Sequence, residues 1–521
     1  MQQSLWLDTH PLHRTSGSAE SSGLQSSAEL PDGAAFDAVI AGAGLTGLTA
    51  AVLLARAGLQ VAVLEARTVG SVATGNTTAK LSLLQGTTLS QISRHQSQKV
   101  LQAYVEGNRE AQAWLLRLLD ERGVAWQRRD AFTYATTQDG AKSLRRELEA
   151  CQQAELPAAW TQDTELPFSV TGAITLPDQA QFHPLEVLGA LLTELGERGG
   201  QVYEGVRVTG ASGAAGTDPL TVETDRGPVR ARHLVLATGA PILDRGGYFA
   251  KLTSHRSYAS AYRVPADGVP QGMYLSADSP SRSLRTAEVQ GEQLLLVGGN
   301  GHPVGRAQSP LGAVEDLDAW TREQFPGAER THAWSAQDYR SANLIPFIGA
   351  LPRGGGRIYV ATGYNKWGMT NAVAAAQEIS AQILGGGFPW AKTLGRRLTT
   401  PADLATGLKD NAAVAAELAS GWIRAEASAL PEQAPAEGAG HVGRVRGRPV
   451  AVSTVDGVTC RVSGVCTHLG GVLRWNDAER SWDCPLHASR FAPDGTVLEG
   501  PAVKPLPRRD SEAQSEDRTD T

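Results

Sequence analysis

The chain has 521 residues, 41% of them hydrophobic and 20% charged, and a net charge of −6. At roughly 150 residues per domain, this length predicts about three domain-sized units. The composition is that of a globular protein, and the acidic balance gives no reason to expect nucleic acid or an anionic membrane as a partner. Apolar runs of about 18 residues or more and a secretory signal are absent, so we expect a cytoplasmic protein without a membrane-spanning helix.

The N-terminal part predicts a βαβ unit behind a polar tail. Residues 1–35 are rich in Ser and Gly, and we expect them to be disordered. Phe36–Ala41 and Gln60–Glu65 predict buried strands, and Gly42–Gly58 between them predicts a glycine turn and a helix.

The predicted elements that follow mix helices and strands. Apolar residues at helical spacing predict helices over 88–122, Pro184–Leu195, Asn371–Leu384 and 402–427. Residues 150–180 are loop-rich with short strands. Further strands are expected at His233–Ala237 and Arg357–Ala361.

The C-terminal part has a different pattern. A Pro-, Ala- and Gly-rich stretch over 429–440 predicts a linker, and short strands and turns follow from His441. Three of the four cysteines lie between Cys460 and Cys484, and the fourth is Cys151. In a chain expected to be cytosolic, this clustering favours a metal centre over a disulfide framework.

The strongest motif is Cys466-Thr-His468 followed by Cys484-Pro-Leu-His487. A Rieske [2Fe–2S] cluster takes two thiolates on one iron and two imidazoles on the other, so each of two loops must supply one Cys and one His. With the flanks CTHLGG and CPLHASRF, residues 433–507 resemble the Rieske family. The resemblance implies these four residues as the cluster ligands. A Cys2His2 zinc site is the alternative, and Cys460 is expected to be a buried structural thiol.

The segment departs from the Rieske family at three positions. Gly471 and Leu486 stand where respiratory-chain members have a disulfide, and Phe491 stands where they have a Tyr hydroxyl, while Ser489 is kept. Because hydrogen-bond donors stabilise the reduced cluster, we expect a potential in the lower half of the Rieske range of about −150 to +300 mV.

A dinucleotide site is predicted by the glycine turn Gly42-Ala-Gly44-Leu45-Thr46-Gly47 between a strand and a helix. Such a turn lets the backbone approach a pyrophosphate at a helix N-terminus. Glu65, followed by Ala66 and Arg67, ends the next strand, where an acid binds a ribose hydroxyl.

Residues 36–395 resemble the D-amino-acid oxidase-like and glycine-oxidase-like oxidoreductases, which implies FAD as the dinucleotide. A second glycine turn, Ala361 to Thr370, stands where the family meets the flavin. The resemblance implies further FAD contacts at Thr74, Gly75, Asn76, Thr77, Thr78, Ala79, Lys80, Val208, Ala237, Thr238, Gly239, Gly363, Gly368, Met369 and Thr370. No cysteine falls at 334–346, where flavinylated relatives have theirs, so we expect non-covalent FAD.

These resemblances imply an α+β/α/β multidomain fold. A Rossmann-type FAD-binding domain (about 36–100, 180–250 and 350–390) is expected to interleave with a mixed-sheet substrate domain (about 101–179 and 251–349). A helix and linker (396–432) then lead to a small all-β Rieske domain (433–507) and a charged, disordered tail (508–521).

Candidate catalytic residues are those expected near the flavin face. Tyr364, Lys366 and Trp367 belong to the second glycine turn, and Arg285, His302, Tyr339 and Arg340 lie in segments that line the substrate half of similar proteins. An arginine could hold a substrate carboxylate through two hydrogen bonds. A second glycine-rich segment, Val297–Gly305, could bind NADH, but Pro303 would break the helix that such a site requires.

The leading hypothesis is a dehydrogenase that oxidises a small amine or amino-acid-like substrate and passes electrons from FAD to the Rieske cluster and an external acceptor, which can be a protein. Substrate reduction with inward electron flow is its mirror image. The alternative is an electron-transfer reductase module that serves a partner protein and has no organic substrate of its own. A Rieske oxygenase is disfavoured because no His pair at suitable spacing for a mononuclear iron precedes the cluster motif.

Overall fold

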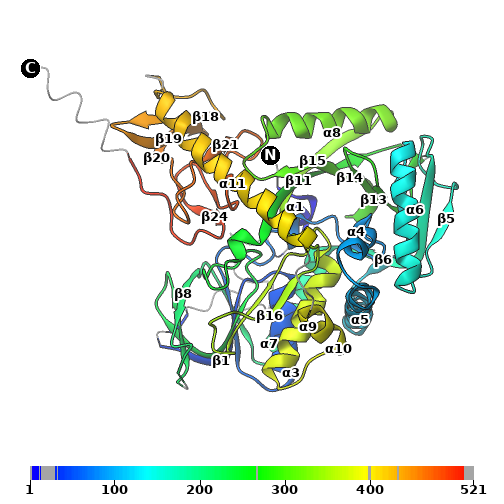
Figure 1. The fold of residues 1–521 in the computed structure, drawn as a ribbon, viewed down its shortest axis with the longest axis horizontal. Helices are drawn as coiled ribbons and strands as arrows, with labels where there is room; N and C mark the ends of the chain where they lie inside the picture. The colour runs from blue at the N-terminus through cyan, green and yellow to red at the C-terminus, as the bar shows by residue number, and fades with distance from the viewer. Residues whose placement is uncertain are drawn as a thin grey trace, which may run out of the picture.

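The computed structural model describes residues 3–10, 12, 30–31, 33–216, 218–265, 268–396, 401–430 and 433–509, without the side chains of 401–406 and 410. Within these ranges the strands form two large sheets and two small ones (Figure 1). None of the helices described is both long and apolar enough to cross a membrane.

The first large sheet is built on five parallel strands in the order β17-β10-β1-β2-β7. These strands are nearly continuous apolar runs because helices cover the sheet. Its strands are β1 (Ala35–Ala41), β2 (Val61–Glu65), β7 (Gln201–Glu204), β8 (Val208–Ser212), β9 (Leu220–Thr224), β10 (Val229–Leu236), β16 (Phe347–Ala350) and β17 (Ile358–Thr362). The helices α3 (Leu45–Arg56), α7 (Pro184–Glu197) and α9 (Gly368–Ile383) pack together beside it.

The second large sheet has the order β15-β11-β14-β13-β12-β4-β6-β3, with β5 beside β6. Its strands are β3 (Lys80–Leu81), β4 (Trp126–Ala135), β5 (Ala159–Thr161), β6 (Gly172–Phe182), β11 (Leu252–Arg263), β12 (Met273–Ser276), β13 (Arg282–Val289), β14 (Glu292–Pro303) and β15 (Glu329–Ser341). The helices around it are α4 (Thr88–His95), α5 (Gln98–Arg122), α6 (Gln138–Gln153) and α8 (Pro310–Gln324).

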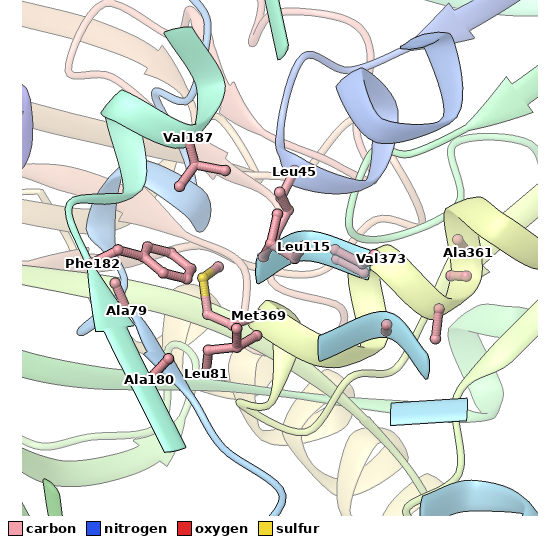
Figure 2. Packing of buried hydrophobic residues seen from close by; sticks show 14 of the residues in the cluster. Leu45, Ala79, Leu81, Leu115, Ala180, Phe182, Val187, Ala361, Met369 and Val373 are labelled. Atoms are coloured by element: carbon pink, nitrogen blue, oxygen red, sulfur yellow. The ribbon is translucent and has the colours of Figure 1, made fainter. Parts of the chain in front are cut away.

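One buried apolar cluster joins the two large sheets. Figure 2 shows Met369 of α9 beside Phe182 of β6 and Leu81 of β3, so the helix of the second glycine turn packs on strands of the other sheet. This packing sets the position of that turn relative to both sheets.

The C-terminal part is all-β, as expected. One small sheet holds β18 (Gly440–Val445), β19 (Arg448–Val455) and β20 (Val458–Ser463), and the other holds β21 (Arg474–Asn476), β22 (Ser481–Asp483), β23 (Arg490–Phe491) and β24 (Val497–Glu499). The short helix α10 (Pro389–Gly395) precedes α11 (Pro401–Ala427), which runs along the large body toward these sheets (Figure 1).

Most predicted elements are confirmed, with shifted boundaries. The helical stretch 88–122 is divided at Gln96 and Ser97, which are extended. The segment 150–180 contains the eleven-residue β6 and the end of α6, which were not foreseen. Two strands depart from the expected division into an FAD-binding and a substrate domain. β3 was expected in the FAD-binding domain and lies in the second sheet, whereas β16 begins in the segment expected for the substrate domain and lies in the first sheet.

The expectation of a disordered N-terminal tail is wrong for its first residues. Leu5–Thr9 form α1, and Leu5, Trp6 and Leu7 are buried. Trp6 donates its indole N–H to the Thr77 carbonyl at 2.6 Å, and Ser4 donates its hydroxyl to the Gly75 carbonyl at 2.5 Å. α1 therefore packs behind the loop 74–80, which the sequence predicts as a flavin contact.

The rest of the two predicted tails is covered only in part. Residues 13–29 and 510–521 lie outside the described residues. Arg508 forms a bridge with Val462, and Arg509 donates its N–H to the Arg461 carbonyl at 2.9 Å, so these two residues continue the β structure.

A matched pair of substitutions tests the role of α1. Leu5 is 1% exposed and Leu408 is 64% exposed. We expect Leu5→Ala to weaken the docking of α1 by about 2–5 kcal/mol, the usual cost of truncating a buried Leu, and to speed amide exchange over 3–10 and 74–80. Leu408→Ala should leave the exchange unchanged. Equal exchange in both variants would contradict this role of α1.

Candidate functional site

A cavity of about 400 Å³ opens at the carboxyl ends of the parallel strands. Ala41 of β1, Glu65 of β2 and Ala361 of β17 line it, as does Ala237 directly after β10. In open α/β sheets this edge is where ligands bind, because the loops that follow the strands diverge there.

The first glycine turn forms one wall of the cavity. Gly42 has a φ of +106°, and a Cβ there would lie 2.6 Å from the Ala237 carbonyl oxygen, so no other residue fits without strain. α3 begins at Leu45 with no side-chain cap from Gly44. The Leu45 N–H donates to the Thr74 hydroxyl at 3.1 Å, and the N–H groups that follow it in the first turn can face a phosphate oxygen. This wall fits the pyrophosphate of FAD.

Glu65 marks the adenosine end of the cavity. Its carboxylate accepts the N–H of Ala43 at 2.8 Å and that of Arg67 at 2.9 Å. Burial raises the pKa of Glu65, and these two hydrogen bonds oppose that shift. Val208 and Arg207 line the same cavity. These residues fit a ribose and an adenine, as the sequence predicts.

The second glycine turn forms the far wall. The Tyr364 hydroxyl lies 2.9 Å from the Thr46 hydroxyl, which joins the two glycine turns across the cavity. α9 begins beside Trp367, again without a side-chain cap. Lys366 has a φ of +68° and also lines the cavity.

Two half-buried ionisable groups give this end of the cavity its electrostatic character. Asp338 of β15 accepts the Lys366 N–H at 2.7 Å. Burial raises the pKa of Asp338 to about 7, against the opposing effect of the Lys366 ammonium group. Lys80 donates to the Tyr274 carbonyl at 2.6 Å and to the Ser283 hydroxyl at 2.7 Å, and burial lowers its pKa well below the ordinary value.

Most residues predicted from the sequence for FAD and catalysis come together around this cavity. Those that line it are Gly42, Gly44, Leu45, Thr46, Glu65, Ala66, Arg67, Thr74, Asn76, Thr77, Thr78, Lys80, Val208, Ala237, Thr238, Gly239, Tyr339, Gly363, Tyr364, Lys366, Trp367, Gly368 and Met369. Gly47, Gly75, Ala79 and Thr370 are not among its lining residues.

Three of the predicted catalytic residues lie outside the cavity wall. Arg285, His302 and Arg340 do not line the cavity within the described part of the chain. Arg285 donates to the carbonyls of Thr78 and Ala79 at 2.8 and 2.7 Å, so it supports the loop 74–80 from behind. The His302 Nε2 lies 3.0 Å from the hydroxyl of Tyr258, and Tyr258, in turn, lines the cavity.

The sequence reasoning missed two parts of the site. Asp338 was not singled out, although it is the one charged residue of the strand segment Trp334–Tyr339. The other part is a wall from the C-terminal region, made by Leu498, Glu499, Gly500 and Val503. No sequence signal places these four residues beside a glycine turn far earlier in the chain.

The glycine-rich segment Val297–Gly305, for which NADH binding was the disfavoured alternative, does not form a nucleotide turn. Residues 292–303 are the strand β14, which pairs antiparallel with β11 and β13. Gly298, Gly299 and Gly301 line the cavity, and the lack of side chains at Gly298 and Gly301 leaves room beside Thr78 and Lys366. This agrees with the preferred interpretation of the segment as part of the substrate half.

The four predicted cluster ligands lie together in the C-terminal region. Cys466 and Cys484 are buried, and their thiols are in hydrogen-bond contact. The rings of His468 and His487 are 5.2 Å apart at their centroids. The buried Nδ1 of His487 has no hydrogen-bond partner within the described residues, so it is free to bind a metal. The donor set fits a [2Fe–2S] cluster with two thiolates and two imidazoles.

Between the two ligand loops, a packing contact stands at the positions where respiratory-chain Rieske proteins have a disulfide. A Cβ on Gly471 would lie 2.7 Å from the Leu486 side chain, so the two residues are in direct contact where relatives have a covalent bridge. The Ser489 hydroxyl accepts the Ala502 N–H at 3.0 Å and lies near Cys466, and Phe491 is fully buried in the same core. The Nε2 of His468 lies 3.5 Å from the Asp244 carboxylate, which leaves its Nδ1 for iron.

The two neighbouring cysteines allow a matched test of the ligand set. Cys466→Ser should remove the cluster, and Cys460→Ser should keep two irons and two labile sulfides per chain, because Cys460 lies on β20 outside the ligand loops. Iron, zinc and sulfide analysis of the purified proteins checks this. One zinc and no iron in the unaltered protein would contradict the Rieske assignment.

The chain was compared with known proteins. Residues 37–382 match the family of FAD-dependent oxidoreductases, and residues 426–509 match the Rieske [2Fe-2S] domain. A putative Rieske 2Fe-2S iron-sulfur protein, YhfW of Bacillus subtilis, is 33% identical over 500 residues, which cover 94% of this chain and 96% of the relative.

Solved structures show the same fold for the larger part of the chain. Glycine oxidase from Geobacillus kaustophilus has a TM-score of 0.57 at 19% identity and covers 68% of this chain and 96% of its own. L-proline dehydrogenase from P. horikoshii has a TM-score of 0.55 at 18% identity, and the match covers 69% of this chain and 96% of that enzyme's chain. The chain therefore belongs to the family of FAD-dependent oxidoreductases, with FAD bound in this domain and a [2Fe–2S] cluster in a C-terminal Rieske domain.

Proposed function

We propose that the protein is a dehydrogenase that oxidises a small amine or amino-acid-like substrate and passes the electrons through its Rieske cluster to an external one-electron acceptor. The observation that carries the proposal is the single cavity lined by both domains. Tyr364 and Lys366 stand on one side of it, and Glu499 and Gly500 of the Rieske domain form part of another. Oxygen takes electrons directly from a reduced flavin, so an enzyme that used oxygen as its oxidant would not need a Rieske domain in the wall of its flavin cavity.

The far end of the cavity supports a small substrate. Gly298 and Gly301 leave space there. Among the described residues, the guanidinium groups that line the cavity are those of Arg67 and Arg207, and both belong to the adenosine end. The solved structures with this fold include enzymes named for glycine and L-proline. A substrate bound here would meet lysines and an acid instead of an arginine.

At this end of the cavity, the cofactor and the side chains have different roles. Bound FAD supplies the group that accepts hydride from a carbon. The Asp338 carboxylate, when ionised, can accept a proton from a substrate ammonium group, since its pKa of about 7 is suited to that exchange near neutral pH. Lys80 and Lys366 can donate hydrogen bonds that orient the substrate, and the Rieske wall excludes water from that side.

The proton-accepting role predicts a pH dependence. In the unaltered protein, substrate-driven flavin bleaching should accelerate as pH rises through about 7, because Asp338 then ionises. Asp338→Asn should flatten this profile and slow bleaching about a hundredfold or more. The exposed Asp178→Asn serves as control. Anaerobic rapid mixing at several pH values measures both effects, and an unchanged profile in Asp338→Asn would exclude the role.

The same pKa shift has a consequence for stability. A carboxyl whose pKa is raised in the folded state binds more protons than in the unfolded state between about pH 4 and 7, so its contribution to stability falls over this range as pH rises. Asp338→Asn should therefore lose less stability between pH 4 and 7 than the unaltered protein. Thermal melts across this range check the sign.

A substrate panel tests the proposal itself. Under anaerobic conditions, at least one small amine or amino acid should bleach the flavin first and the cluster second. The panel should pair each amino acid with its decarboxylated amine, because no arginine among the described residues lines the substrate end, which predicts that the amine is tolerated. Bleaching by a reduced partner protein but by no member of the panel would favour the alternative of an electron-transfer module.

A further inference from the structure

The interface between the two domains is centred on one buried arginine. Arg256 of β11 is 1% exposed and belongs to the FAD-dependent domain. Its guanidinium pairs with Glu479 at 3.1 Å and with Glu499 at 3.2 Å, both from the Rieske domain. It also donates to the Ser335 hydroxyl at 2.6 Å and to the Gln337 amide oxygen at 2.7 Å. The charge is thus shared by both domains.

The acids on the Rieske side depend on this arginine. Arg490 of the Rieske domain also contacts Glu479 and lies 2.8 Å from Glu499 and 3.2 Å from Asp483. Three acids therefore face two arginines within a buried group. Burial alone would raise the pKa of Glu479, but Arg256 and Arg490 outweigh it and lower the pKa to about 2. Undocking would leave this group with one arginine for three acids.

The same interface reaches the cluster on its cysteine side. Gln337 lines the cavity and donates its amide N–H to the Ala488 carbonyl at 3.0 Å. Ala488 follows the ligand His487, and its own N–H donates to the carbonyl of Cys484 at 3.0 Å. Two hydrogen bonds and short covalent segments therefore join the cavity wall to a cluster ligand.

The histidine side of the cluster faces the FAD-dependent domain as well. Phe249 lies edge-on to both imidazole rings, with centroids 6.4 Å from His468 and 5.5 Å from His487, and is 38% exposed. Asp244 of the same loop faces His468. Arg306 adds a further contact by donating to the Pro485 carbonyl at 3.1 Å. Contacts on two sides of the cluster therefore hold the domain in one orientation.

From these contacts we infer that the Rieske domain receives electrons in this docked position, without a domain swing, and that Arg256 is the positioning residue that holds it there. The inference rests on the proposed function. Each substrate oxidation releases two electrons, and the cluster accepts one at a time. The external acceptor, a one-electron oxidant, must therefore reoxidise the cluster after each transfer, while the protons leave to solvent.

The inference is tested with light instead of substrate. Flash photoreduction of the bound flavin by a deazaflavin starts the transfer, and absorbance follows reduction of the cluster. Arg256→Met should keep FAD, iron and the electron paramagnetic resonance spectrum of the cluster but slow the transfer about tenfold or more, because it leaves Arg490 as the single arginine facing three buried acids. It should also speed amide exchange over 477–500. The control is Arg263→Met, which removes an exposed ion pair with Glu292. An unchanged transfer rate in a loaded Arg256→Met protein would overturn the inference.

A second measurement uses the unaltered protein and so does not depend on how the variant folds. Transfer in a fixed contact should be independent of solvent viscosity when glycerol is added, whereas a swinging domain should slow in proportion to it. A proportional slowing overturns the docked position while leaving the proposed function intact. No cluster reduction at all after the flash contradicts the proposed function itself, and the inference with it.

Discussion

The pairing of one buried guanidinium across the domain interface is the constraint on which the arrangement of this protein depends. A charge as deeply buried as that of Arg256 is strongly destabilising unless opposite charges and hydrogen-bond acceptors surround it. Here the neutral acceptors come from β15 and the two carboxylates come from the Rieske domain. Neither domain satisfies the charge alone, so the two are held together and share the wall of one cavity.

The cavity itself follows from the topology of the parallel sheet. Strand ends that meet at one edge bring together two glycine turns and the N-termini of α3 and α9, which face the cavity without caps. The contact between Thr46 and Tyr364 joins positions 318 residues apart. A site assembled in this way is rigid at its phosphate-binding end. At the other end, residues from the second sheet decide the chemistry.

Both domains contribute contacts to the ligands of the cluster. Packing of Leu486 on Gly471 takes the place of a disulfide between the ligand loops. Asp244 and Phe249, both from the larger domain, lie against the histidine ligands. Because outer contacts orient metal ligands and tune potentials, the properties of this cluster depend on docking as well as on the Rieske sequence.

The sequence by itself indicated the cluster and a dinucleotide site, because each has a short motif whose spacing carries the chemistry, and the wider resemblance of residues 36–395 specified FAD as the dinucleotide. Cys466-x-His468, Cys484-x-x-His487 and the turn from Gly42 to Gly47 are local, and so are the apolar periodicities that predicted most strands and helices. Such patterns lie within short segments of the sequence, so they can be interpreted without knowledge of the fold.

Only the tertiary structure decided which polar residues face the cavity and which support it. Arg285 was expected near the substrate, but burial behind the loop 74–80 turns its donors toward backbone carbonyls. Asp338 gains its importance from burial in the cavity wall, and Arg256 from Glu479, which lies 223 positions away. The N-terminal helix α1 is ordered by contacts with residues 71 positions further on. The role of a polar side chain depends on its partners and its exposure, and both are set by long-range contacts that no local pattern encodes.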